Sequence, residues 1–557
     1  MASGRWLQPS SFPNLSLARE LQSLWLPGRV PLLNAITLTA ATVLIALFAV
    51  FTTTFAFTQT KFVVALVLGL IGAFGFLVSG NRRLFVLYAI VMLAPLKLGK
   101  DFMPIGHQGG AGSFVLDAGD PFFLMLAAYQ FNDWRKRRLR DYRVPLIAKL
   151  WVGMIALGVI TMLTGPFKTP AAHEVVRMAK YLLLLLLLIN ELKRKKQFRH
   201  VAFGLMLGVL IQSGFSAVSY ATGSQFGLDF LGEETEDNVE ELGAATLKGD
   251  LALRRPGGLM GHPNQFAGYL ALIMPLGIGL LFSPISLRLK SLFVCTLLAG
   301  QVGLLLTLSR SGWICFAMGL VSTLVLSFLH RSSRRRYLIA RAVVIVLVGA
   351  MALAASPLIL ERIQYSDPES WRSRMEFVDI SQEIVLDHPL FGVGLNSYVF
   401  AQAPYTRQRT FAGLKDFYGE NVPVVHSTWM LTWAEQGTVG MVMFVLIHLA
   451  VLYVGFNNLK LKDGFLHAMN VGLLSGFGAI MLDGLVSFFV RMEVGGRMFW
   501  FVIALILAIG YWRRTHETGI ERGAAGSGTD TVMGHGERTW MTVRQRRNES
   551  GRGWLLR

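Results

Sequence analysis

Long apolar runs recur along this chain, and short clusters of Lys and Arg separate them. A run of about 20 apolar residues is long enough for one helix to cross the hydrocarbon core of a bilayer. The chain has 557 residues, of which 53% are hydrophobic and only 16% charged, a balance too apolar for a soluble protein of this size. The pattern therefore predicts an all-α, polytopic transmembrane protein.

We expect about 12 to 14 transmembrane helices, because fourteen segments are apolar and several of them are short. The segments are 35–57, 63–79, 84–97, 115–131, 145–164, 176–191, 201–222, 262–283, 291–308, 312–329, 342–360, 428–455, 465–490 and 498–512. Before the first of them, residues 17–25 place Leu and Trp on one helical face, which favours an interfacial helix.

Basic residues gather in alternate loops, which indicates that those loops are cytoplasmic. The clusters lie at 82–83, 135–143, 193–199, 288–290, 331–336 and 460–462. The loops between them, an acidic one at 223–260 and a long one at 361–427, then lie outside, and both termini are cytoplasmic.

The predicted organisation has five parts. They are a cytoplasmic or interfacial segment at 1–30, transmembrane helices with the acidic outer loop at 31–360, a large periplasmic loop at 361–427, C-terminal transmembrane helices at 428–512, and a disordered cytoplasmic tail at 513–557.

Two other classes of site find no support in the composition. Lys and Arg number 53 against 34 Asp and Glu, but the excess sits in loop clusters between apolar runs, so we expect no nucleic acid. The two cysteines, Cys295 and Cys315, both lie inside apolar runs, where they are expected to pack rather than to form a disulfide or bind a metal.

Polar residues at the expected outer membrane face are candidates for chemistry. Arg255 precedes the segment Pro-Gly-Gly-Leu-Met-Gly-His262-Pro263, which enters an apolar run. One interpretation is a helix start with Pro in its first turn and an arginine at the interface. The other is that Arg255 presents its five-donor guanidinium to a phosphate beside a helix N-terminus.

Arg310 lies between two apolar runs with almost no connecting loop. An arginine this close to hydrocarbon is costly, so it needs a partner. An anionic ligand and a buried carboxylate are the two alternatives.

The long outer loop contains Arg372 and Arg374 in a stretch where Trp371, Met375 and Val378 share a helical face. This spacing predicts a helix lying on the membrane surface. The two arginines could bind glycan or phosphate, or could face lipid head groups.

His426 lies where the long loop re-enters the membrane, and Glu435 follows it inside the next apolar run. A neutral imidazole can accept a proton near neutral pH. Glu435 could orient that histidine or could instead pair with a neighbouring helix.

Across roughly residues 250–440 the chain resembles the O-antigen ligase-like family, which includes O-antigen ligases and the polymerases of O-antigen and exopolysaccharide. Four segments in a fixed order carry the resemblance: Arg255-Pro-Gly-Gly-Leu-Met-Gly-His-Pro-Asn-Gln-Phe-Ala, Leu308-Ser-Arg-Ser-Gly-Trp, His388-Pro-Leu-Phe-Gly-Val-Gly-Leu-Asn-Ser-Tyr, and His426-Ser-Thr-Trp with Glu435-Gln-Gly.

The resemblance implies a GT-C-like glycosyltransferase of the bacterial inner membrane with a periplasmic active site. It implies an inverting, metal-independent reaction without a cofactor, in which an undecaprenyl diphosphate-linked glycan is moved to a glycan or to lipid A-core. Arg255 and Arg310 would then hold the diphosphate, and His426 would be the catalytic base. Family members usually have Asn after this histidine, whereas this chain has Ser427.

Ligase and polymerase need the same diphosphate site, so the sequence leaves both open for lipopolysaccharide or exopolysaccharide biosynthesis. A transporter or flippase is the alternative class. It would require charged residues along a path through the membrane, for which Glu435 and Asp483 are the deep candidates in the later helices.

Overall fold

The structure is a computed structural model that describes residues 79–105, 109–136, 142–223, 255–328, 338–354, 368–406 and 424–518, with a few further positions near 72–77, 226–233 and 356–360. The expected helix at 17–25, the span at 35–57, most of the span at 63–79, most of the acidic loop and the tail beyond residue 518 lie outside the described residues. The chain divides into two units, Met1–Ile90 and Val91–Arg557.

The described part of the first unit contains the start of α4, Arg82–Leu93. Asn81 Oδ1 accepts a hydrogen bond from the backbone N–H of Leu84 at 3.1 Å. The Arg82 guanidinium lies 5.6 Å from the centre of the Phe76 ring, which meets Phe85 edge-on. These local contacts fix where α4 begins.

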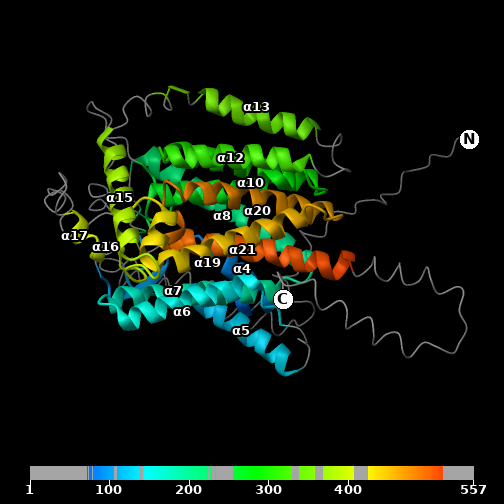
Figure 1. Cartoon of the computed structure of the whole chain (residues 1–557). Coiled ribbons are helices and arrows are strands. Elements are labelled where there is room, and N and C mark those ends of the chain that lie inside the picture. Colours follow the sequence, from blue (N-terminus) through cyan, green and yellow to red (C-terminus); the bar gives the residue numbers. More distant parts are fainter. Residues whose placement is uncertain are drawn as a thin grey trace, which may run out of the picture. The chain divides into compact units, whose positions relative to one another are not determined.

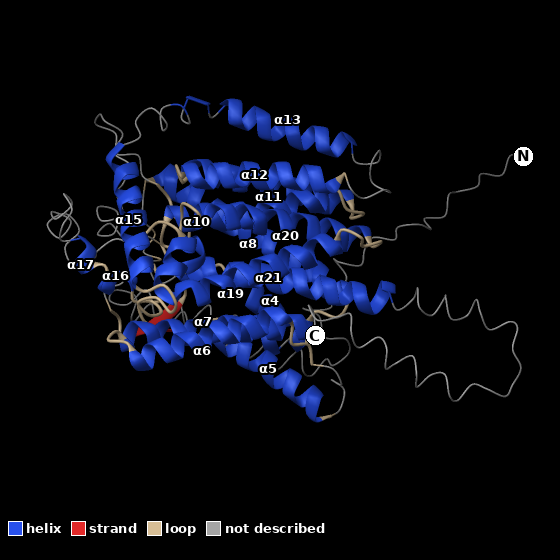
Figure 2. Ribbon diagram, viewed as in Figure 1, coloured by secondary structure: helices blue, strands red, loops and turns tan. Residues whose placement is uncertain are grey.

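The second unit opens with an antiparallel β-hairpin, the strand pair among the helices in Figure 2. β1, Gly99–Phe102, pairs with β2, Phe114–Asp117. α5, Asp120–Arg135, begins directly afterwards, and Asp120 accepts the backbone N–H of Asp117 at 2.9 Å. The expectation that a helix begins at residue 115 was therefore wrong, because a short apolar run fits a strand as well as a helix, and the helical fold contains one short hairpin.

Eight helices among the described residues are long and apolar enough to cross a membrane, and each overlaps an expected span. They are α6 Leu146–Thr164, α8 Lys195–Thr222, α10 Pro263–Leu281, α11 Leu287–Leu306, α12 Arg310–Ser327, α19 Thr428–Asn458, α20 Gly464–Asp483, and α21 Glu493–Arg513 with its extension η5 Arg514–Thr518. The chain is thus a polytopic, mostly helical membrane protein.

Three further expected spans are helices of a different character. α4 has 12 residues and α13, Leu338–Ala354, has 17, which is short for a span. α7, Lys168–Glu191, is long enough but carries several charged side chains in its first half. The count of fourteen spans stays a prediction.

Helices α10, α20 and α21 form the buried centre of the second unit, and α10 contacts α12 as well as α20 (Figure 1). Small residues let two of these helices approach closely. A Cβ on Gly476 of α20 would lie 2.1 Å from the Leu272 carbonyl oxygen of α10, and one on Gly472 would lie 2.4 Å from Leu276 Cα. This four-residue spacing of glycines is typical of helix packing in membranes.

The segment between α13 and α19 contains α15 Pro368–Asp387 and two short helices, α16 Tyr398–Ala401 and α17 Ala403–Thr406. The helix expected around Met375 is confirmed as α15. Its buried face is formed by Phe377, Ile380 and Ile384, whereas Met375 is exposed. That face packs against Val424, which precedes α19, and Leu431 in the first turn of α19, which belong to the same hydrophobic cluster. That α15 lies on the membrane surface stays a prediction.

A turn that follows α15 docks on a kink in α19 at Gly437, where φ is 61° and ψ is −168°. Around the kink the Val393 N–H donates to the Ala434 carbonyl at 3.0 Å, and the Thr438 N–H donates to the Pro389 carbonyl at 2.8 Å. The kink frees helical groups that the turn then satisfies, as every buried backbone group requires.

We predict that Gly437→Ala lowers the thermal unfolding midpoint of the purified protein. Its backbone lies in the left-handed region, which costs a residue with a side chain about 1 to 3 kcal/mol, and its Cβ would lie 2.3 Å from the Leu390 carbonyl group. Gly478→Ala is the matched control, because that site has nothing within 4 Å of a new Cβ. An equal effect of the two substitutions would contradict the docking role of Gly437.

Candidate active site

Arg255 connects the first two sequence motifs through two hydrogen bonds. Its Nε donates to the Thr307 carbonyl at 2.8 Å, and its Nη2 donates to Asn264 Oδ1 at 2.9 Å. Asn264 lies in the first turn of α10, and Thr307 directly precedes the turn that leads into α12. Arg255 therefore holds two helix ends side by side.

Each of the three helices that carry the motifs begins with a side-chain cap. His262 Nδ1 accepts the Asn264 N–H at 3.0 Å on α10, Ser309 Oγ accepts the Gly312 N–H at 3.4 Å on α12, and Ser427 Oγ accepts the Met430 N–H at 3.3 Å on α19. Asn and Ser are both good caps, which gives a physical reason why Ser427 can replace the usual Asn.

Arg310 is the first residue of α12, after a turn in which Leu308 has a positive φ of 50°. Within the described chain its side chain makes no hydrogen bond and no ion pair. A cation at a helix N-terminus is unfavourable, because the helix dipole is positive at that end. The carboxylate alternative thus finds no support here, whereas an anionic ligand would relieve the repulsion.

Arg374, near the start of α15, lies close enough to Arg310 for the two guanidinium groups to interact. Burial lowers the pKa of Arg374, and the charge of Arg310 lowers it further, against a smaller opposite effect of Asp483. Arg374 also makes no ion pair with any residue that the structure describes. The two arginines form a positive cluster without an ion pair, and Asp483 offsets its charge only in part.

His426 lies beside this cluster. Its ring is half-buried and packs edge-on against Phe488 at a centroid distance of 5.2 Å, and its Nδ1 has no hydrogen-bond partner in the described part of the chain. Burial, together with the charge of Arg374, lowers the pKa of His426 to about 4. The imidazole is therefore neutral at neutral pH and able to accept a proton.

His262 completes the group, because it interacts electrostatically with Arg255, His426 and Lys97. The site thus joins residues from the starts of α10, α12 and α19 with one from α15. Helix N-termini that converge in this way favour anions.

Glu435 has a different environment. It is fully buried, pairs with Arg491 at 2.5 Å, and accepts the Tyr398 N–H at 3.4 Å. The pair joins α19 to η4, Phe489–Arg491, so the interpretation of Glu435 as a partner of a neighbouring element has structural support. No contact between Glu435 and His426 occurs in the described residues.

The expected site residues divide into three groups. Arg310, Arg374 and His426 come together with Arg255 close by, Glu435 lies in its own ion pair, and Arg372 is exposed. His262 and Arg491 were not assigned a role from the sequence. His262 stands inside a motif that carries the resemblance, so its place there was the available signal.

The long apolar helices, with basic side chains gathered where several of them begin, define a polytopic membrane protein with a candidate anion site. Residues 293–445 match the family model described as O-antigen ligase, so the chain carries a domain of that family. The match includes Arg310, Arg374, His426 and Glu435 but neither Arg255 nor His262.

No match is found among curated proteins. Among solved structures, the chain is similar to one from work on the structural coordination of polymerization and crosslinking by a peptidoglycan synthase complex. The TM-score is 0.33 at 16% identity, over 67% of this chain and 98% of that chain, which is too weak to support an argument.

We predict that the end of the bundle that holds this site faces outward, from the alternation of basic loops. In a Cys295→Ser background, a membrane-impermeant maleimide should label Lys100→Cys in the hairpin of intact spheroplasts. It should label Arg194→Cys, at the start of α8, only after lysis. Both positions are exposed, so the reverse pattern would invert the orientation.

Proposed function

We propose that the chain is an inner-membrane glycosyltransferase that moves an undecaprenyl diphosphate-linked glycan onto an acceptor, as an O-antigen ligase or a polysaccharide polymerase. One observation carries the proposal. Arg310 and Arg374 form a positive cluster that makes no ion pair in the described chain, beside a histidine whose pKa is lowered by burial, and all three lie in the family-matched segment.

The arginines bind the diphosphate of the donor. Two guanidinium groups that repel each other gain most from a ligand with several negative oxygens, and each planar fork can make two parallel hydrogen bonds to phosphate. Charge develops on the diphosphate as it leaves, and preorganised donors at that point lower the barrier. Arg255 holds the two helix ends and thereby positions this cluster.

His426 is the general base. The acceptor hydroxyl transfers its proton to the imidazole while its oxygen forms a bond to the anomeric carbon of the donor sugar. The bond between that carbon and the diphosphate oxygen breaks, and its electron pair leaves with the lipid diphosphate. Attack opposite the leaving group inverts the anomeric centre.

The membrane arrangement follows the loop charges, with the site in the periplasm and both termini in the cytoplasm. The acceptor is a glycan in a polymerase, and lipid A-core or another molecule in a ligase. Deletion of the gene separates these cases. Loss of long chains with single-unit caps retained indicates a polymerase, and accumulated lipid-linked polymer indicates a ligase.

A transporter or flippase is less well supported. Of its two deep candidate carboxylates, Glu435 is in an ion pair with Arg491, and Asp483 accepts a hydrogen bond from the Cys315 thiol at 3.3 Å. Both groups therefore have structural partners. Unchanged envelope glycans in the deletion strain would nevertheless favour this class.

We predict that Arg310→Lys lowers transfer by about 10- to 150-fold, because an ammonium retains the charge but loses the second arm of the fork, a charge-assisted hydrogen bond of about 1.5 to 3 kcal/mol. The measurement is turnover of lipid-linked donor by protein in nanodiscs. Arg288→Lys, at an exposed position in the first turn of α11, is the control and should keep full activity. Wild-type turnover by the Arg310→Lys protein would mean that only a positive charge is needed at this position.

We predict that His426→Gln lowers turnover by about 100- to 10,000-fold while donor binding stays close to that of the wild type, because the arginines hold the diphosphate. Wild-type activity should persist well below pH 6 and fall as the pH approaches about 4, where His426 becomes protonated and cannot accept a proton. His516→Gln, at an exposed position, is the control. An active, folded His426→Gln protein would rule out the general-base assignment.

A further inference from the structure

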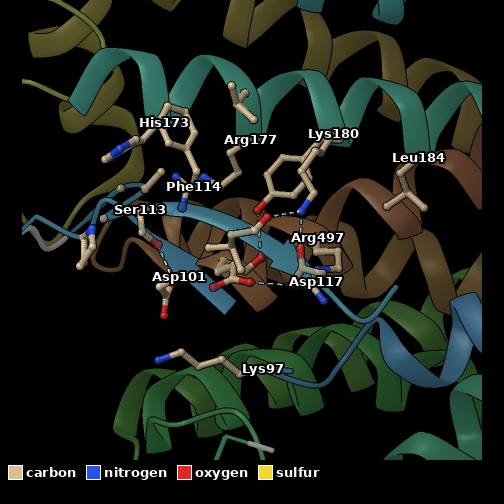
Figure 3. A pocket seen from close by; sticks show the side chains of 18 of the residues that line it. Lys97, Asp101, Ser113, Phe114, Asp117, His173, Arg177, Lys180, Leu184 and Arg497 are labelled. Atoms are coloured by element: carbon tan, nitrogen blue, oxygen red, sulfur yellow. Dashed lines mark hydrogen bonds and ion pairs between the residues drawn. The ribbon is translucent and has the colours of Figure 1, made fainter. Parts of the chain in front are cut away.

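A cavity of about 270 Å³ lies between the β-hairpin, α7 and the start of α21 (Figure 3). His173, Arg177 and Lys180 reach it from α7, and Lys97 lies on its opposite side (Figure 3). All of its lining residues lie outside the segment that matches the family model. The sequence motifs assign no role to this cavity.

The charged groups around the cavity compensate one another. Asp117 pairs with Lys180 at 2.5 Å and with Arg497 at 2.7 Å, and Arg497 also pairs with Glu493 at 2.8 Å. Beside them, Arg177 pairs with Glu174 at 2.5 Å. A free anion would have to break these pairs, so the cavity suits a ligand without net charge.

His173 is a polar group in this wall without a partner. It is 1% exposed and both of its ring nitrogens are buried without a hydrogen bond, while its ring packs edge-on against Phe114 at 4.3 Å. A neutral imidazole offers one donor and one acceptor, which a sugar hydroxyl can match. Leaving such a group unsatisfied is costly, so a ligand that satisfies it gains affinity.

The cavity adjoins the candidate active site at two points. A Cβ on Gly109, the residue before the lining residue Gly110, would lie 2.7 Å from both methyl groups of Val424, two residues before His426. On the other side, a Cβ on Gly261, next to His262, would lie 3.8 Å from Lys97 Nζ. The wall is also held to the family domain, because Asn396 Nδ2 donates to the Ala111 carbonyl at 2.9 Å.

We infer that this cavity is a carbohydrate subsite that holds an uncharged, hydroxyl-rich sugar of the acceptor glycan. The assignment rests on the proposed function, since it places the acceptor beside His426. His173 exchanges hydrogen bonds with the sugar, Lys97 donates to it from the rim, and the rings of Phe114 and Tyr181 cover apolar faces. The diphosphate stays with the unpaired arginines.

The test uses the full chain in nanodiscs and two probes, titrated by calorimetry. One is a lipid-free oligosaccharide released by mild acid from the host's own surface polysaccharide, and the other is inorganic pyrophosphate. His173→Phe keeps the ring that packs on Phe114 but removes both nitrogens, and should weaken oligosaccharide binding about 10- to 100-fold, as expected for one or two lost hydrogen bonds. Pyrophosphate binding should not change.

Lys97→Met is the second variant, at an exposed position, and should also weaken oligosaccharide binding. Lys100→Met is its matched control, because Lys100 is exposed on β1 but does not line the cavity. In transfer assays both cavity variants should raise the KM for the acceptor more than they lower kcat.

Three outcomes would overturn the inference. They are no oligosaccharide binding by the wild type, wild-type affinity in both cavity variants, or a loss of pyrophosphate binding that parallels the loss of oligosaccharide. A separate result bears on the proposed function: pyrophosphate binding that is insensitive to Arg310→Lys would remove the diphosphate site. The sugar subsite would still stand if His173→Phe weakens oligosaccharide binding.

Discussion

A charged side chain at the edge of hydrocarbon is costly unless a partner compensates its charge. This constraint distinguishes two groups of charged residues in the second unit. One group is paired: Glu435 with Arg491, and Asp117 with both Lys180 and Arg497. Breaking a buried pair costs about 3 to 5 kcal/mol, so these residues hold elements together and are poorly suited to bind a ligand. The other group, Arg310 with Arg374, makes no ion pair in the described chain at the point where helices begin, and is therefore available to an anion.

Apolar packing along α15 sets the position of Arg374. Phe377, Ile380 and Ile384 of α15 bury one face against the residues around His426, and Arg374 lies one turn before Phe377 on that same face. The other end of α15 is anchored through the turn that docks on the kink at Gly437. A helix fixed at both places carries Arg374 to His426, whereas the exposed Arg372, two residues away, points elsewhere.

Much of this could be predicted from local sequence. Apolar runs located the long helices, and Pro263 marked a helix start as Pro commonly does. Arg310 could be recognised because an arginine between two apolar runs needs a partner. These signals are local, so they can be recognised without knowledge of the tertiary structure.

Other features depend on contacts between distant segments. Glu435 meets Arg491 across 56 residues, and Asp117 meets Arg497 across 380, so no spacing rule predicts either pair. The strand Phe114–Asp117 is too short for its periodicity to distinguish it from a helix. The cavity is formed by the β-hairpin, α7 and the start of α21, which are distant in sequence. Taken alone, each of these segments resembles an ordinary helix end or turn.

On the proposed assignment, the arginine cluster and the sugar cavity differ in charge. This difference determines which product leaves the enzyme and which one stays bound. Transfer releases a lipid diphosphate with more negative charge than the donor had, and a neighbouring cavity with unpaired positive charge would compete for it. Because the charges around Asp117 are already paired, the sugar subsite offers that product little attraction. The diphosphate then leaves from the arginines while hydrogen bonds to neutral hydroxyls retain the lengthened glycan, an arrangement that suits repeated addition to a held chain.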